Sequence, residues 1–235
     1  MAQTDRIYPV GDRQPSRGAG GYSSLAVDRP EAARVLRNTY ALLSLTLLFA
    51  AATASAAVAF ALPAPGLIIT LVGYFGLLFA VTKLRNSGWA IPAVFALTGF
   101  MGYTLGPILS YTLALPGGAG TIAAALGATG ATFLALSGYV LVTRKDMSFM
   151  GGFLFAGMIV AIIMGIVAYV FSMPALALGV SAVVALLSVG LILFETSRIV
   201  NGGETNYVMA TVGLFVSLFN LFTSLLHLFG FASSD

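Results

Sequence analysis

The basic residues of this chain follow a pattern that strongly limits how it can fold. All eleven Lys and Arg residues lie either before residue 38 or in three short segments further along the chain. Those segments contain Lys83 and Arg85, Arg144 and Lys145, and Arg198. Between them lie long apolar stretches and three connections without charge, at residues 62–66, 113–120 and 172–175. Such alternation is the positive-inside pattern of a chain that crosses a membrane an odd number of times.

The composition argues against a water-soluble domain. Hydrophobic residues make up 59% of the 235 residues and charged residues only 8%, whereas a soluble domain carries about 25% charged residues. The formal net charge of +3 does not indicate nucleic-acid binding, because the basic residues are spread over loops that would face anionic lipid headgroups. The chain has no Cys, which excludes disulfides and thiolate chemistry. We expect no nucleic-acid partner, cofactor or metal site.

Seven apolar stretches are each close to the roughly 20 residues that a helix needs to cross a bilayer. They occupy residues 37–62, 66–83, 89–111, 121–143, 149–171, 176–195 and 207–229. We therefore predict an all-α transmembrane bundle of seven helices, with the N-terminus cytoplasmic and the C-terminus outside. A six-span alternative needs one re-entrant stretch, which the charge alternation disfavours. Residues 31–235 would form this domain, and residues 1–30 a disordered cytoplasmic tail.

A polar stripe runs along the last predicted helix. Its members share one helical face and are Ser217, Asn220, Ser224 and His227. Because polar groups are costly against lipid, the stripe should face the bundle interior or a watery cavity. Ser217 and Asn220 together favour a functional cavity, whereas Ser224 is equally explained as a hydrogen bond between helices. His227 is either a hydrogen-bonded residue at the outer interface or a group that titrates near neutral pH.

Glu195 is the second candidate, because it directly continues the sixth apolar stretch. It is either an interfacial residue with its carboxylate in water or a titratable gate at the cytoplasmic mouth. Three cations are candidates to pair with it, namely Lys83, Arg85 and Arg198. Asp146 and Glu204 lie in the neighbouring inner loops, which are either a secondary polar cluster or solvated loops.

An intramembrane serine protease is excluded by the predicted topology. Ser137 would lie near the inner face and His227 near the outer face, with depths that differ by roughly 20 Å. A nucleophile and its base need a separation of about 3 Å. We therefore do not expect an enzyme.

Several segments resemble the Bax inhibitor-1 (transmembrane Bax-inhibitor-motif) family. They are residues 35–40, 102–107 and 143–149 and, most specifically, the block that runs from Phe194 through residues 202–207 to Phe222. The resemblance implies a seven-helix fold in which the last helix is central. It also implies that the protein resides in the bacterial inner membrane, where some members bind the FtsH protease complex and restrain it. These members are themselves degraded slowly from the N-terminus. A tail of about 30 residues spans about 30 Å, which is enough to reach an unfoldase pore.

The resemblance also implies an alternative function, a pH-sensitive leak for Ca²⁺ or another cation. Members of that kind pair an Asp at the end of the sixth helix with an Asp in the seventh, next to an Arg from the second. Here the first position is Glu195 and the second is Ser217, so the carboxylate pair is altered. Lys83 or Arg85 would stand in for the Arg.

Overall fold

The computed structural model describes residues 29–232. Within this range the chain forms seven long helices and one short 3₁₀ helix, η1, and no β-strand. In chain order these are α1 (Arg29–Ala59), α2 (Leu67–Leu84), α3 (Ala90–Ala114), α4 (Gly118–Thr143), η1 (Ser148–Met150), α5 (Gly151–Val170), α6 (Pro174–Val200) and α7 (Tyr207–Ala232). Each of the seven long helices is long and apolar enough to cross a membrane. This confirms the predicted all-α, seven-helix bundle.

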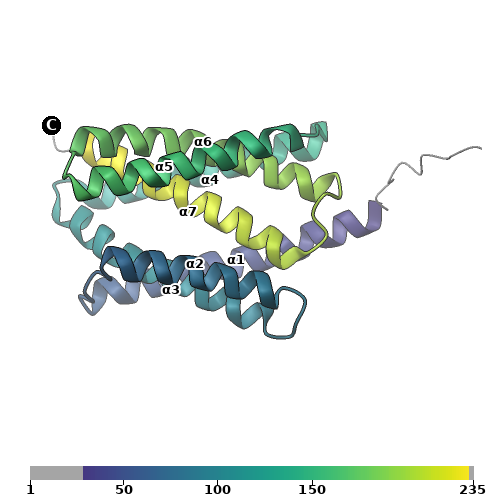
Figure 1. The fold of residues 1–235 in the computed structure, drawn as a ribbon, viewed down its shortest axis with the longest axis horizontal. Coiled ribbons are helices and arrows are strands. Elements are labelled where there is room, and N and C mark those ends of the chain that lie inside the picture. The colour runs from purple at the N-terminus through teal and green to yellow at the C-terminus, as the bar shows by residue number, and fades with distance from the viewer. Residues whose placement is uncertain (1–28, 233–235) are drawn as a thin grey trace, which may run out of the picture.

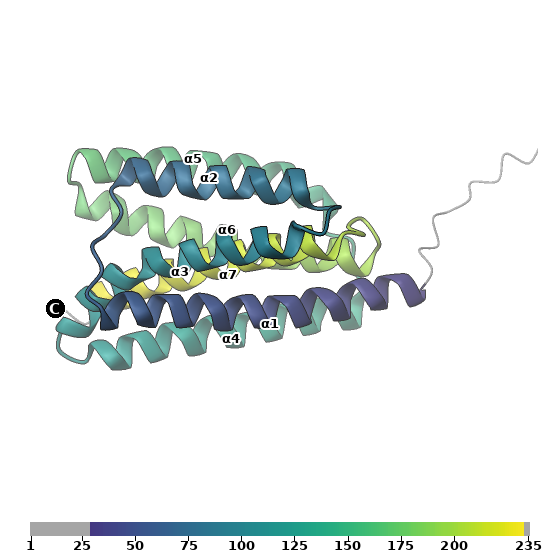
Figure 2. The same cartoon turned by 90° about the horizontal axis from the view of Figure 1, so that it is seen from below.

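Two layers of three helices enclose α7 (Figures 1 and 2). In one layer α1 and α2 pack on α3, and in the other α4 and α5 pack on α6. Between the layers α7 runs obliquely and contacts α1, α3, α4 and α6. It is the most buried of the seven spans, and α2 is the least buried. The seventh helix is therefore the centre of the bundle.

Small residues bring α1 and α3 into close contact. A Cβ atom at Gly102 would overlap the backbone oxygen of Ala50 and the hydroxyl of Thr53, and one at Gly106 would overlap the Cβ of Ala57. In a membrane the lipid is as apolar as the protein interior, so close backbone approach supplies much of the packing energy between helices. These two glycines therefore fix how α1 lies against α3.

The two ends of the bundle differ in charge. One end, here called the basic end, holds the start of α1 and the α2–α3, α4–α5 and α6–α7 connections, with Lys83, Arg85, Arg144, Lys145 and Arg198 in or next to them. The other, the neutral end, holds the three connections without charge. At the basic end, α1 begins beyond the ends of the other helices (Figure 1).

Two helices extend at least five residues beyond a predicted end. α1 begins at Arg29 rather than at residue 37, and Glu31 lies in its first turn, where a carboxylate interacts favourably with the helix dipole. α6 continues past Glu195 to Val200, because the polar residues Thr196 and Ser197 face the bundle and are buried. The prediction that Glu195 ends the sixth helix was therefore wrong. The predicted tail, residues 1–30, lies outside the described residues except for its last two, which belong to α1.

Candidate functional site at the basic end

Glu195 places its carboxylate between α6 and α7. The side chain is 15% exposed, and it fills the space that Gly213 leaves open on α7. A Cβ atom at Gly213 would meet the carboxyl carbon of Glu195 at 2.7 Å. The absence of a side chain at position 213 therefore allows a carboxylate to sit inside the helix interface.

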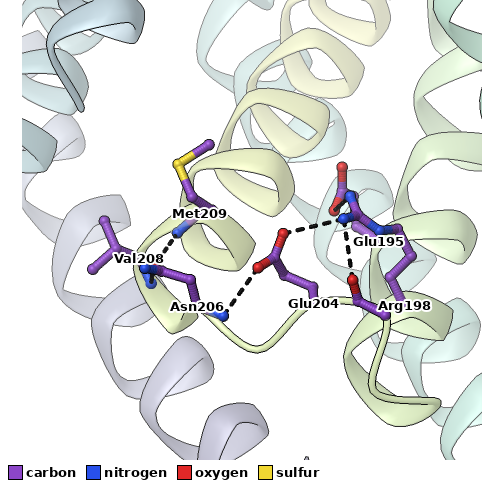
Figure 3. Close-up of polar contacts among 7 residues, drawn as sticks. Glu195, Arg198, Glu204, Asn206, Val208 and Met209 are labelled. Atoms are coloured by element: carbon purple, nitrogen blue, oxygen red, sulfur yellow. Dashed lines mark hydrogen bonds and ion pairs between the residues drawn. The ribbon is translucent and has the colours of Figure 1, made fainter. Parts of the chain in front are cut away.

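Arg198 joins this carboxylate to the α6–α7 loop (Figure 3). Its Nη1 lies 3.9 Å from Glu195 Oε2, and its Nη2 lies 3.2 Å from Glu204 Oε2. Nη2 also donates a hydrogen bond to the carbonyl oxygen of Gly203 at 3.3 Å, while Glu204 Oε1 accepts one from the backbone N–H of Asn206 at 2.9 Å. The Arg198 and Glu204 side chains are 32% and 18% exposed. Two carboxylates thus share one guanidinium that is largely shielded from water.

Asn206 connects the same loop to two other elements. Its Oδ1 accepts hydrogen bonds from the backbone N–H groups of Val208 and Met209, at 3.0 and 3.1 Å, which makes Asn206 the N-cap of α7. Its Nδ2 donates to the carbonyl oxygen of Arg85 at 3.1 Å and to Asn86 Oδ1 at 2.9 Å, in the α2–α3 connection. We call the connected set the Arg198 cluster; its members are Glu195, Arg198, Gly203, Glu204 and Asn206.

Lys83 and Arg85 are not brought to Glu195. The Lys83 Nζ lies over the Phe79 ring of its own helix, 5.6 Å from the ring centroid, and Arg85 contributes its backbone carbonyl to Asn206. Within residues 29–232, the ion pair of Glu195 is formed with Arg198. Because α6 continues beyond Glu195, Arg198 follows three residues later on the same helical face.

Asp146 stays apart from Glu204. It is exposed, and its Oδ1 accepts a hydrogen bond from the backbone N–H of Ser148 at 2.8 Å. Hydrogen bonds from Ser148 lower the pKa of the Asp146 carboxyl. The neighbouring residues attach the α4–α5 connection to α6, since Ser197 Oγ donates to the Lys145 carbonyl at 3.0 Å and accepts from the Met147 N–H at 2.9 Å. Asp146 therefore stabilises its own turn.

The predicted polar stripe lies along the α6–α7 interface. Ser217 is buried, and its Oγ donates to the Gly213 carbonyl at 3.0 Å. Asn220 is half-buried, and its side-chain amide forms no hydrogen bond with any described residue. At the neutral end His227 is exposed, and its Nδ1 lies 2.7 Å from Ser181 Oγ. The stripe thus begins beside the Arg198 cluster and ends at the opposite end of the bundle.

Ser137 and His227 lie far apart in the bundle. The Ser137 hydroxyl lies 3.4 Å from the Thr196 hydroxyl, in the last turns of α6, whereas His227 contacts Ser181 near the start of that helix. These two residues do not form a nucleophile and base.

Sequence reasoning gave no specific role to three residues that help to build this end: Asn206, which lies in the loop predicted as part of a polar cluster, and Ser197 and Gly213. One signal was available, because Asn206 directly precedes the last apolar stretch and Asn is a preferred N-cap residue. No local signal marks Ser197 or Gly213, since their partners lie on other elements.

The cluster chemistry is electrostatic. Two carboxylates, one guanidinium and one amide hold the α6–α7 and α2–α3 connections together at the basic end. The described residues contain no group of three or more His, Asp or Glu side chains that could hold a metal ion. The arrangement is therefore suited to fix the shape of this end, or to respond when its charges change.

Comparisons with known proteins bear on the role of this end. The profile of the family described as Inhibitor of apoptosis-promoting Bax1 matches residues 32–234. The Modulator of FtsH protease YccA of Escherichia coli strain K12 is 57% identical over 203 residues, which cover 86% of this chain and 92% of that protein. A protein of E. coli O6:H1 with the same identity and coverage is named Inner membrane protein YccA. An uncharacterized protein of Pseudomonas aeruginosa is 48% identical over 213 residues, 91% of this chain and 96% of that one.

Proposed function

The chain belongs to the Bax inhibitor-1 family, and we propose that it is an inner-membrane protein that binds the FtsH protease complex and restrains it. The observation that carries this proposal is the 57% identity, over most of both chains, with a protein named as a modulator of that protease. On this proposal the protein acts by contact and not by catalysis, and its partners are the protease complex and the surrounding lipid.

The basic end offers the surface for this contact. The charge pattern predicts that it faces the cytoplasm, where an ATP-driven protease takes hold of its substrates. The chain enters α1 at this end, and α1 begins beyond the other helices (Figure 2). The Arg198 cluster fixes two of the neighbouring connections. We propose that residues 1–28 are the segment that the protease engages and that the fixed connections form the surface beside it.

Two linked experiments test the proposal. Crosslinking in native membranes followed by purification of this protein should recover FtsH. Deletion of residues 2–28, which stops before α1 begins at Arg29, should leave a protein that still inserts but is no longer degraded by the protease. A variant in which a Gly/Ser segment of equal length replaces residues 2–28 is the matched control. It restores the length of the N-terminal segment but not its amino-acid sequence. Recovery of no FtsH would contradict binding, and unchanged degradation of the deletion variant would contradict the role of the segment.

A cation leak is the second candidate, and the buried position of the Glu195 carboxylate favours it. Position 217, where calcium-leak members carry their second carboxylate, holds a serine bonded to its own helix, but Glu204 brings another carboxylate to Arg198. In proteoliposomes, Ca²⁺ flux should fall in Glu195→Gln and remain unchanged in Asp146→Asn, an exposed acid at the same end. Flux no higher than in empty liposomes at any pH would eliminate this candidate.

A further inference from the structure

Two contacts fix the register between the antiparallel helices α6 and α7. Near the basic end, Glu195 lies against Gly213. Near the neutral end, the Ser181 hydroxyl lies 2.7 Å from the His227 Nδ1. On each helix the two contacting residues are fourteen positions apart, so they lie on one face and four turns from each other. The same faces of α6 and α7 therefore meet along this whole length.

This register places Ser188 opposite Asn220. Ser188 is seven residues from both Ser181 and Glu195, and Asn220 is seven residues from both Gly213 and His227. Seven residues make close to two helical turns, which returns each side chain to the contact face. Both residues lie near the midpoints of their helices and hence near the middle of the membrane.

Both side chains lack partners. The Ser188 hydroxyl is completely buried and has no hydrogen-bond partner, unlike Ser181, which donates to the Ala177 carbonyl one turn back. The Asn220 amide forms no hydrogen bond within residues 29–232. A buried polar group such as the Ser188 hydroxyl is nearly always paired in proteins, and an ordered water is a usual partner when no protein group is near. The Asn220 side chain is half-buried.

A cavity leads towards this pair from the neutral end. It has a volume of about 470 Å³ and lies between α3, α6 and α7. Its lining includes three exposed residues, Tyr111, His227 and Phe231, together with the half-buried Ser181 and the buried Ser224. Ser224 lies one helical turn, or about 6 Å, from Asn220. Ser188 and Asn220 do not line the cavity themselves, so one helical turn separates its polar end at Ser224 from Asn220.

The path is closed on the other side. Between the Ser188–Asn220 pair and Glu195, the packed layer includes Ile192 of α6 with Leu214 and Phe215 of α7, and these side chains are at most 1% exposed. The Arg198 cluster lies beyond this layer. This packed layer therefore separates the Ser188–Asn220 pair from the Arg198 cluster.

We propose that α3, α6 and α7 enclose an aqueous half-channel, which opens at the neutral end and ends at a water site between Ser188 and Asn220. Its occupant is water and the protons that water carries. Among the described residues that line the cavity, none is Asp or Glu, and a divalent cation such as Ca²⁺ prefers carboxylate oxygens. The half-channel goes beyond the modulation of a protease, because it brings water from one side of the membrane to within two helical turns of Glu195.

Cysteine accessibility tests the proposal directly, because the natural chain has no Cys. Single cysteines are introduced into the full-length chain as Ser224→Cys, Asn220→Cys and Ser188→Cys. Each is treated with a charged, membrane-impermeant methanethiosulfonate reagent in sealed cells and in inverted vesicles. A thiol in contact with water forms the reactive thiolate, whereas an apolar surrounding suppresses it. We expect all three variants to react from the side that the neutral end faces.

Matched controls distinguish a water-filled path from exposure to lipid and identify the side from which the reagent enters. Leu186→Cys lies at nearly the same depth as Ser188, on an outer face of α6 where Leu186 is 73% exposed, and should react at least tenfold more slowly than Ser188→Cys. Ala64→Cys and Ser87→Cys lie in connections at the neutral and basic ends and report which side each end faces. Since Ser188→Cys replaces one oxygen by sulfur, it should fold even if Asn220→Cys does not.

Three results would overturn the proposal. The first is reaction of Ser188→Cys and Asn220→Cys no faster than that of Leu186→Cys. The second is reaction of the three cysteines from the side that labels Ser87→Cys. Reaction of Ser224→Cys alone belongs with it, because the water path would then end at the cavity. The third is protection of Ser188→Cys by millimolar Ca²⁺, which would identify a cation site in place of a water site.

Discussion

Arg198 is the residue on which the contacts of the basic end converge. Arg198→Gln leaves the carboxylates of Glu195 and Glu204 without their shared cation. Exposed ion pairs contribute about 0–1 kcal/mol, and breaking a buried pair costs about 3–5 kcal/mol. Because the Arg198 side chain is one-third exposed, we expect the free energy of unfolding to fall by about 1–2 kcal/mol. Denaturant unfolding in detergent micelles measures this change.

Two further variants show whether that loss comes from the ion pairs. Arg198→Lys keeps the charge but not the planar fork that contacts Glu204 and the Gly203 carbonyl, so it should lose about half as much stability. In Arg198→Gln combined with Glu195→Gln, one of the two unpaired carboxylates is neutral while Glu204 stays charged, and part of the lost stability should return. Strictly additive effects of the two substitutions would show that these side chains do not interact.

Asn206 combines two roles that substitution can separate. Asn206→Ala removes both the cap of α7 and the bonds to the α2–α3 connection, and the lost cap alone costs about 1 kcal/mol. Asn206→Asp keeps the capping oxygen but loses the Nδ2 donor to the Arg85 carbonyl and Asn86. We therefore expect unfolding stability to fall clearly in the first variant and less in the second. Amide hydrogen exchange at residues 85–88 should quicken in both, and protection equal to that of the wild type would contradict the link.

At the scale of helices, a single methyl group should disturb the contact between α1 and α3. In Gly102→Ala the new Cβ would overlap the backbone oxygen of Ala50, which cannot turn away as a side chain could. Overpacking of this kind costs about 1–3 kcal/mol, more than the roughly 1 kcal/mol by which Ala favours a helix over Gly. We expect a lower thermal midpoint in detergent. Gly127→Ala on α4 is the control, because its Cβ meets nothing within 4 Å, and its midpoint should be unchanged or higher. Equal midpoints for the two variants would contradict the close approach.

The number of helices was predictable from the sequence, but two of their ends were not. Apolar length and the positions of the basic residues give all seven spans. The end of α6 was misplaced because the polar residues Thr196, Ser197 and Arg198 are typical of a loop, whereas the first two are buried and continue the helix. That error also left three cations, Lys83, Arg85 and Arg198, as equal candidates to pair with Glu195. Once α6 is known to continue, Arg198 lies at the i+3 position, and Lys83 and Arg85 are no longer needed as candidates.

At the scale of the whole molecule, the residues that build the site come from distant parts of the chain. Asn206 reaches Asn86 across 120 residues of sequence, and Gly213 matters only because a carboxylate from another helix fills its space. No periodicity or motif in the sequence predicts contacts between residues so far apart in the chain. The sequence indicated a polar stripe on α7 and a carboxylate on α6, but their common register appears only when the two helices are placed side by side.

The position of α7 connects the proposed protease-binding surface with the proposed half-channel. It lies between the two layers, so its start is held by the Arg198 cluster and its end lines the cavity at the neutral end. The part between them is tightly packed. Because α7 is one continuous helix, it joins the basic end, where we propose that the protease binds, to the opposite end of the bundle.

The central claim is that this protein restrains the FtsH protease, and the rate of proteolysis tests it most directly. Purified FtsH and a membrane protein that it degrades are reconstituted in proteoliposomes with or without the full-length chain. We expect the substrate to be degraded several-fold more slowly when the chain is present, and the variant lacking residues 2–28 to restrain the protease less. An unchanged rate of substrate degradation, with the chain folded and in molar excess over the protease, would contradict the claim.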